Sequence, residues 1–113
     1  MLYKAILINK QDRYVAGDDF LFTFVLVDEN GDYLSDLSGW EFESTFYSLA
    51  NSIPNSYITI ITSGNKIYVS IPNSATEDLN SNVKYILILK GSLSDKDYSL
   101  SRETFYVEDE ILD

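Results

Sequence analysis

The sequence predicts an all-β protein built as an antiparallel sandwich or barrel. Short runs of aromatic and β-branched residues alternate with polar ones along most of the chain, which is the period-two pattern of strands. Turn-forming residues separate these runs at intervals of roughly 8 to 12 residues, the spacing of small all-β domains. The 113 residues fit a single domain, 1–113, with about seven or eight strands.

The most apolar strand is expected over residues 19–28 and organises its neighbours. Phenylalanines occupy alternate positions from Phe20 to Phe24, and Leu, Thr and Val fill the positions between and after them. Both faces are therefore apolar, which predicts a central strand covered on each side for part of its length. Residues 28–31, DENG, end the run with an Asn-Gly pair that favours a hairpin turn. We expect the chain to turn back there and resume at Tyr33.

The other strands follow from the same alternation. They are expected at residues 2–8, a short piece at 13–15, 40–46, 57–62, 66–71, 83–90 and 98–107. The first begins close to residue 1, so we expect it to be an edge or exchangeable strand. In the strand from Trp40, the aromatic residues Phe42 and Phe46 share its parity and indicate a core face. Glu41 and Glu43 fall on the opposite, open face.

Turns are expected at residues 36–39, 63–65 and 91–97. Residues 73–79 form the only helix candidate, and it is too short to be stable alone. Pro72 ends the preceding strand because it lacks a backbone donor. Asn73 or Ser74 is expected to cap the helix, with Glu77 placed three residues after Ser74 as in a capping box.

Composition excludes several classes of function. The net charge is −10 and the pI is about 4.2, which disfavours direct nucleic-acid binding. The chain has no cysteine and no histidine, so it lacks a thiol nucleophile, the commonest general base and the commonest zinc ligand. No apolar run approaches the roughly 20 residues of a membrane span, and residues 1–4 do not begin a signal peptide. We expect no cofactor and no enzymatic activity.

One group of acidic residues has the composition of a calcium loop. Asp28, Asn30, Asp32 and Asp36 present alternating oxygen ligands, but the spacing lacks the sixth-place Gly and twelfth-place Glu of a calcium-binding EF-hand loop. An ordinary turn is the better interpretation, and calcium stays open.

Paired carboxylates for acid–base chemistry are also disfavoured. Asp18 and Asp19 are neighbours that would point to opposite faces, and Asp18 is expected to cap a turn that Gly17 permits. Glu41 and Glu43 share a face, but adjacent exposed acids usually face solvent.

The aromatic content is the stronger signal of function. The chain has nine tyrosines, and tyrosine is enriched at interfaces because its ring buries area while its hydroxyl keeps a polar partner. The candidate interaction residues are Tyr3, Tyr33, Tyr57, Tyr68, Ile111 and Leu112. The last two lie in an acidic tail, residues 108–113, that could dock onto a neighbour by strand addition. The competing interpretations are that the tyrosines line the rims of the core and that the tail is frayed.

Several short motifs in a fixed order resemble an immunoglobulin-like domain of bacteriophage virion proteins, such as the N-terminal domain of baseplate upper and tail-fibre proteins. They are Gly17-Asp18, Asp28-Glu29-Asn30-Gly31, Asp36-Leu37-Ser38-Gly39, Ala75-Thr76 with Leu79, Tyr85, and Phe105-Tyr106-Val107, spanning about residues 11 to 109. Asn82 and Lys84 stand where the family usually has a glycine. The resemblance implies an immunoglobulin-like antiparallel β-sandwich.

The resemblance also implies a function. Family domains usually head a longer fibre chain, whereas this chain stops after the domain. We therefore expect a structural subunit located in the virion: a head decoration protein, or a collar, tail or fibre-anchoring adaptor that contacts other virion proteins in many copies. Two alternatives stay open. One is a carbohydrate-binding or adhesion module that stacks sugars on surface tyrosines, and the other is a soluble immunoglobulin-like inhibitor or binder.

Overall fold

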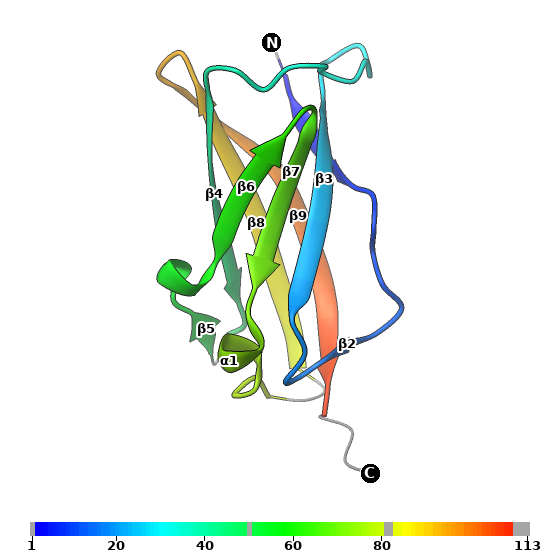
Figure 1. Cartoon of the computed structure of the whole chain (residues 1–113), viewed down its shortest axis with the longest axis vertical. Coiled ribbons are helices and arrows are strands. Elements are labelled where there is room, and N and C mark those ends of the chain that lie inside the picture. The colour runs from blue at the N-terminus through cyan, green and yellow to red at the C-terminus, as the bar shows by residue number, and fades with distance from the viewer. Residues whose placement is uncertain (1, 50, 81–82, 110–113) are drawn as a thin grey trace.

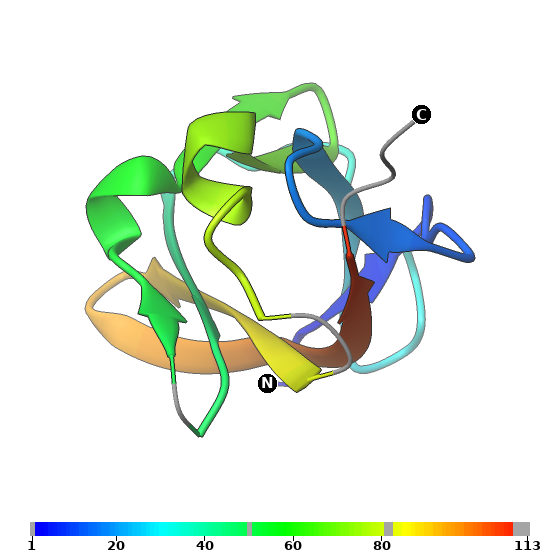
Figure 2. The same cartoon turned by 90° about the horizontal axis from the view of Figure 1, so that it is seen from below.

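Two β-sheets packed face to face form the fold of the computed structural model, which describes residues 2–49, 51–80 and 83–109. The four-stranded sheet has the order β1 (Lys4–Leu7), β3 (Phe20–Val27), β7 (Lys66–Ile71), β6 (Thr59–Ser63). The five-stranded sheet has the order β2 (Tyr14–Val15), β9 (Lys96–Glu108), β8 (Val83–Leu93), β4 (Trp40–Tyr47), β5 (Ser52–Ile53). The short helices η1 (Asn55–Tyr57) and α1 (Asn73–Thr76) lie toward one end of the sandwich, as Figures 1 and 2 show.

The order of the strands is that of the immunoglobulin fold. β1, β3, β7 and β6 correspond to its A, B, E and D strands, and β9, β8 and β4 to its G, F and C strands. Described pairings are antiparallel except that β2 runs parallel to β9. The protein is therefore an immunoglobulin-like β-sandwich, and the predicted fold class is confirmed.

β3 is the central strand that the sequence predicted. It lies between β1 and β7, and Phe22 and Phe24 point into the core with no exposed surface. Val25 and Val27 on the other face are also buried, at 7% and 5% exposure, whereas Leu21 is 45% exposed. Burial on both faces over most of its length explains why the strand lacks an apolar–polar alternation.

A buried tyrosine links β8 to the turn before it. Tyr85 is fully buried and its ring stacks on that of Phe46, with centroids 5.2 Å apart. Its hydroxyl oxygen accepts a hydrogen bond from the backbone N–H of Asn80 at 3.0 Å. A tyrosine near the start of strand F that bonds back to the backbone is the tyrosine corner of immunoglobulin-like domains.

The helix α1 begins differently from the sequence prediction. Pro72 is its N-cap, and no side chain of the helix makes a capping hydrogen bond, so the predicted capping box is wrong. The Asp19 carboxylate reaches across from the start of β3 and accepts the Asn73 N–H at 2.7 Å. The side chain of Asp19, distant in sequence, thus caps the helix where a neighbouring residue was expected to do so.

The predicted turn at residues 91–97 is also wrong in extent. β8 continues to Leu93 and β9 begins at Lys96, so only Ser94 and Asp95 form the turn. Gly91 lies inside β8, where an added Cβ would come within 3.0 Å of Phe42 and Trp40 and 2.9 Å of Leu100. The glycine therefore allows close packing of neighbouring side chains and does not form a turn.

Candidate interaction surfaces

The four-stranded sheet is free of acidic residues. None of its strands, β1, β3, β7 or β6, contains Asp or Glu, and their only charged residues are Lys4 and Lys66. The five-stranded sheet, in contrast, carries Glu41, Glu43 and further acids on β9. On a chain with a net charge of −10, this distribution makes one face of the sandwich unlike the rest of the surface.

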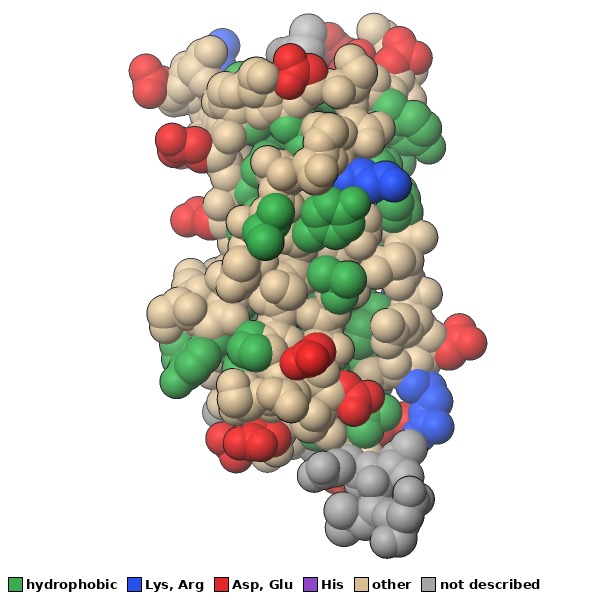
Figure 3. Space-filling view, viewed as in Figure 1, with side chains coloured by type: hydrophobic (Ala, Val, Ile, Leu, Met, Phe, Trp, Pro, Cys, Tyr) green, Lys and Arg blue, Asp and Glu red, His purple; other side chains and the backbone are tan. Residues whose placement is uncertain are grey.

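Apolar side chains continue across the outer face of this sheet. Cross-strand pairing places Ile6 beside Val25, and Tyr68 between Thr23 and Ile61. We call this surface the acid-free face and define it by Ile6, Leu21, Val25, Ile61 and Tyr68. Figure 3 shows hydrophobic side chains gathered over the middle of this side of the molecule, with acidic side chains toward its ends and rim.

The tyrosines predicted as interaction residues lie in different environments. Tyr3 packs against the core, with edge-to-face ring contacts to Trp40 and Tyr98 at 5.0 and 5.1 Å. Tyr33 and Tyr57 are 67% and 51% exposed, the first beyond β3 and the second in η1.

Of the four candidate tyrosines, Tyr68 lies on the acid-free face, where it is partly buried. Ile111 and Leu112 lie outside the described residues. The structure therefore does not gather the candidate tyrosines into one surface.

Rings of the exposed tyrosines are also scattered. Tyr106, 63% exposed, is on β9 in the five-stranded sheet, whereas Tyr33 and Tyr57 lie outside the named strands. Among the described residues, the recorded ring contacts involve buried or half-buried aromatics and none of these three. Sugar-binding sites stack a ligand on rings that share one surface, and the described tyrosines do not supply such a platform.

The carboxylate of Asp28 is hydrogen-bonded to backbone groups of its own turn. Asp28 Oδ1 accepts hydrogen bonds from the N–H groups of Asn30 and Asp32 at 2.9 and 3.1 Å, and Gly31 has φ +82°. The turn thus forms where the sequence predicted it. Across the described residues, no cluster of three or more acidic side chains is close enough to hold a metal ion, and the oxygens of Asp28, Asp32 and Asp36 are not grouped as a calcium site.

Local hydrogen bonding or burial shifts the pKa of two titratable groups, Asp36 and Tyr14. The pKa of Asp36 is lowered because the Ser38 side chain and backbone N–H both donate to its carboxylate, at 2.7 and 2.9 Å. The pKa of Tyr14 is raised mainly by burial of its ring in the core, opposed by a hydrogen bond that its hydroxyl accepts from the Gln11 N–H. Each effect belongs to a turn or to the core, and the two groups are not paired for catalysis.

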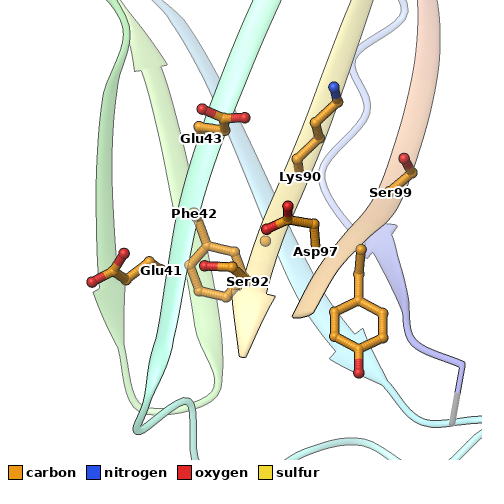
Figure 4. Close-up of a pocket in the computed structure, with 9 residues that line it drawn as sticks. Glu41, Phe42, Glu43, Lys90, Ser92, Asp97 and Ser99 are labelled. Atoms are coloured by element: carbon orange, nitrogen blue, oxygen red, sulfur yellow. The ribbon is translucent and has the colours of Figure 1, made fainter. Parts of the chain in front are cut away.

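A shallow pocket of about 350 Å³ lies on the five-stranded sheet around Gly91. Its lining includes Glu41, Glu43, Lys90 and Asp97, and Figure 4 shows Glu41 turned away from the other charged groups. The two glutamates share the open face, as their alternation predicted, and both are exposed. Catalytic acid–base pairs have pKa values shifted by burial. Glu41 and Glu43 are exposed, so this pocket lacks that feature.

The acid-free face was missed by the sequence interpretation, although a signal for it exists. Lys66 and Tyr68 alternate with buried residues along β7. A scan of the acidic residues by predicted strand would have shown none at 2–8, 57–62 and 66–71, and acids at 19–28 only at the two ends, Asp19 and Asp28. The buried Thr76 belongs to the Ala75-Thr76 motif, but the sequence predicted no role for its hydroxyl. Its hydroxyl donates to the Asp18 carbonyl oxygen at 2.6 Å and accepts the Gly17 N–H at 3.1 Å.

Comparison with known proteins shows no family for this chain. No family model matches the chain, and no curated protein matches it in sequence. A solved structure of three titin immunoglobulin domains, an E-to-A mutated variant, superposes with a TM-score of 0.42 at 12% identity; the match covers 95% of this chain and 32% of that one. This chain therefore spans about a third of that structure's length. Among the described helices, none has the length and apolar character needed to span a bilayer.

Proposed function

We propose that this protein is a non-enzymatic structural component of a bacteriophage virion, acting through contacts with other virion proteins. The observation that carries the proposal is the acid-free face. Four adjacent strands without an Asp or Glu, on a chain with 18 acidic residues, keep one surface suited to contact with protein. Interface centres are depleted in acidic residues and include aromatic ones, and this face has no Asp or Glu and includes Tyr68.

The placement in a virion is supported by the motifs that resemble the phage family. Gly17-Asp18 and Thr76 come from distant parts of the sequence, yet they are joined by the hydrogen bonds of the Thr76 hydroxyl. Tyr85 accepts a hydrogen bond from the backbone N–H of Asn80, as in a tyrosine corner. These motifs therefore work together as one structural unit, which is what a shared domain architecture requires.

Mass spectrometry of purified particles from the phage that encodes the chain tests the proposal. Peptides of the chain should be recovered from density-banded particles in a fixed ratio to the major structural proteins. Their absence from banded particles would overturn the proposal.

A pair of variants tests the role of the acid-free face in incorporation. Tyr68→Glu places an acid on that face and should lower the amount of protein incorporated. Tyr106→Glu, at a 63% exposed tyrosine on the other sheet, is the matched control and should incorporate normally. Equal incorporation of the two folded variants would remove the acid-free face from the contact.

A further inference from the structure

β6 is an unprotected edge strand. It forms the edge of the four-stranded sheet, where its described partner is β7, and four of its five residues are exposed. Its sequence, TIITS, has no charged residue, proline or glycine, and its pairing with β7 has no register shift. Natural proteins usually block an edge with one of these devices, because a free row of N–H and C=O groups pairs readily with another strand.

The other described edges are short or charged. β2 and β5 have two residues each, and β1 carries Lys4. The part of β4 that β5 does not cover carries Glu41 and Glu43. Among these edges, β6 is therefore the one that is both longer than two residues and without a charged residue.

Charge also favours a second copy of this chain as the occupant of that edge. Two molecules with a net charge of −10 each repel one another wherever acids face acids. The sequence from residue 44 to residue 65, which includes all of β6, contains no Asp, Glu, Lys or Arg. Contact at β6 therefore places a segment without acidic residues of one chain against the same segment of the other.

The β6–β7 hairpin fixes which backbone groups of β6 are free. Ser63 pairs with Lys66 across the two-residue turn Gly64-Asn65, and Gly64 has φ +61°. The residues flanking a two-residue turn form a hydrogen-bonded pair, and this pairing alternates along antiparallel strands. Ser63, Ile61 and Thr59 therefore direct their backbone groups to β7, whereas Ile60 and Thr62 direct theirs to the open edge.

We propose that β6 pairs antiparallel with β6 of a second copy, about a two-fold axis that passes through Ile61. In this register the outward groups of Ile60 bond with those of Thr62 of the other copy, and the two Ile61 residues lie directly opposite in a non-hydrogen-bonded pair. Thr59 then faces Ser63 of the other copy, so the pairing brings no charges together.

The proposed contact closes on itself. Each copy offers one such edge, so the product is a dimer with one continuous eight-stranded sheet and no open polymer. Ile61 is 59% exposed in the single chain, and in the dimer it joins the acid-free faces of the two copies into one surface. The partner is thus defined by the chain itself, independently of any role in a virion.

Cysteine cross-linking tests the register directly. The chain has no cysteine, so Ile61→Cys introduces a single thiol on the proposed axis. Non-hydrogen-bonded antiparallel pairs place Cα atoms about 4.5 Å apart, within disulfide range. Mild oxidation should convert this variant to a covalent dimer. The control Leu21→Cys is 45% exposed on the same face but away from the edge, and should stay largely monomeric.

A charge-pairing experiment tests the same axis without a covalent bond. Ile61→Lys and Ile61→Glu alone should each raise the dimer Kd at least about tenfold in sedimentation equilibrium, because like charges then oppose one another. Mixing the two variants should restore a heterodimer, while circular dichroism shows both folded. A strictly monomeric wild type, or equal cross-linking of the Ile61→Cys and Leu21→Cys variants, would overturn the proposal. Neither result bears on the presence of the chain in particles, which tests the proposed function separately.

Discussion

The Tyr85 hydroxyl of β8 accepts a hydrogen bond from the backbone N–H of Asn80, upstream of the strand, at 3.0 Å. The ring below this hydroxyl is fully buried and stacked on Phe46. One residue thus joins the core to the backbone of a turn, and its two contributions can be separated by mutation.

Replacing Tyr85 with Phe should keep the ring packing and remove the acceptor for the Asn80 N–H. We expect a loss of about 0.5–1.5 kcal/mol in the free energy of unfolding, the net contribution of one hydrogen bond, because Asn80 is exposed and its freed N–H can bond to water. Urea denaturation followed by tryptophan fluorescence measures it. Tyr106→Phe, at a 63% exposed position of β9, is the control and should change stability by less than about 0.5 kcal/mol. Equal effects of the two variants would mean that the hydrogen bond contributes nothing.

The hydroxyl of Thr76 should contribute to the stability of the fold at least as much as that of Tyr85. It has no exposed surface and bonds to the backbone of both Gly17 and Asp18. Thr76→Val keeps the shape but removes both hydrogen bonds, so we expect a loss of about 2 kcal/mol in the free energy of unfolding. Thr76→Ser retains the hydroxyl and should lose clearly less, mainly through one missing methyl group. If thermal denaturation shows Thr76→Ser to be less stable than Thr76→Val, packing of the methyl group contributes more to stability than the two hydrogen bonds.

Gly91 should not tolerate a methyl group. An added Cβ would meet side-chain atoms of Leu100, Phe42 and Trp40 at 2.9 to 3.0 Å, closer than ordinary van der Waals contact. We therefore expect Gly91→Ala to lower the free energy of unfolding by about 1–3 kcal/mol through overpacking. Chemical denaturation measures this, and Gly91→Ala combined with Phe42→Leu should recover part of the loss. An unchanged midpoint for the single variant would mean that the neighbouring rings can move aside.

The sequence predicted the sandwich well because its signals are local. Period-two alternation located β3 and β4, and the Asn-Gly pair located the turn after β3, where Gly31 has φ +82°. The immunoglobulin-like arrangement of the sheets came from the motif resemblance, since strand spacing alone left a barrel open.

Long-range contacts explain what the sequence interpretation missed. Gly91 was assigned to a turn because glycine usually marks one, but packing from β4 and β9 requires it within a strand. The cap of α1 comes from Asp19, 54 residues away, which no local capping pattern can reveal. The acid-free face likewise depends on which strands share a sheet, and the strand order is a property of the whole fold.

The turn between β8 and β9 is strained and should be improved by glycine. Leu93 pairs with Lys96, and both intervening residues have positive φ, 53° at Ser94 and 65° at Asp95. This two-residue turn favours Asn-Gly, because glycine has no Cβ to clash in the left-handed region.

We expect Ser94→Asn with Asp95→Gly to raise the free energy of unfolding by about 0.5–1 kcal/mol, measured by thermal denaturation. Asp95→Asn removes the same charge but keeps the Cβ, so it controls for the lower net charge. The strain lies in the backbone of the native turn, and glycine relieves it. The free energy of unfolding of the glycine variant should therefore rise more than that of Asp95→Asn. Equal stabilisation by the two variants would assign the gain to reduced repulsion among the acidic residues, and a destabilised glycine variant would show that the turn carries no strain to relieve.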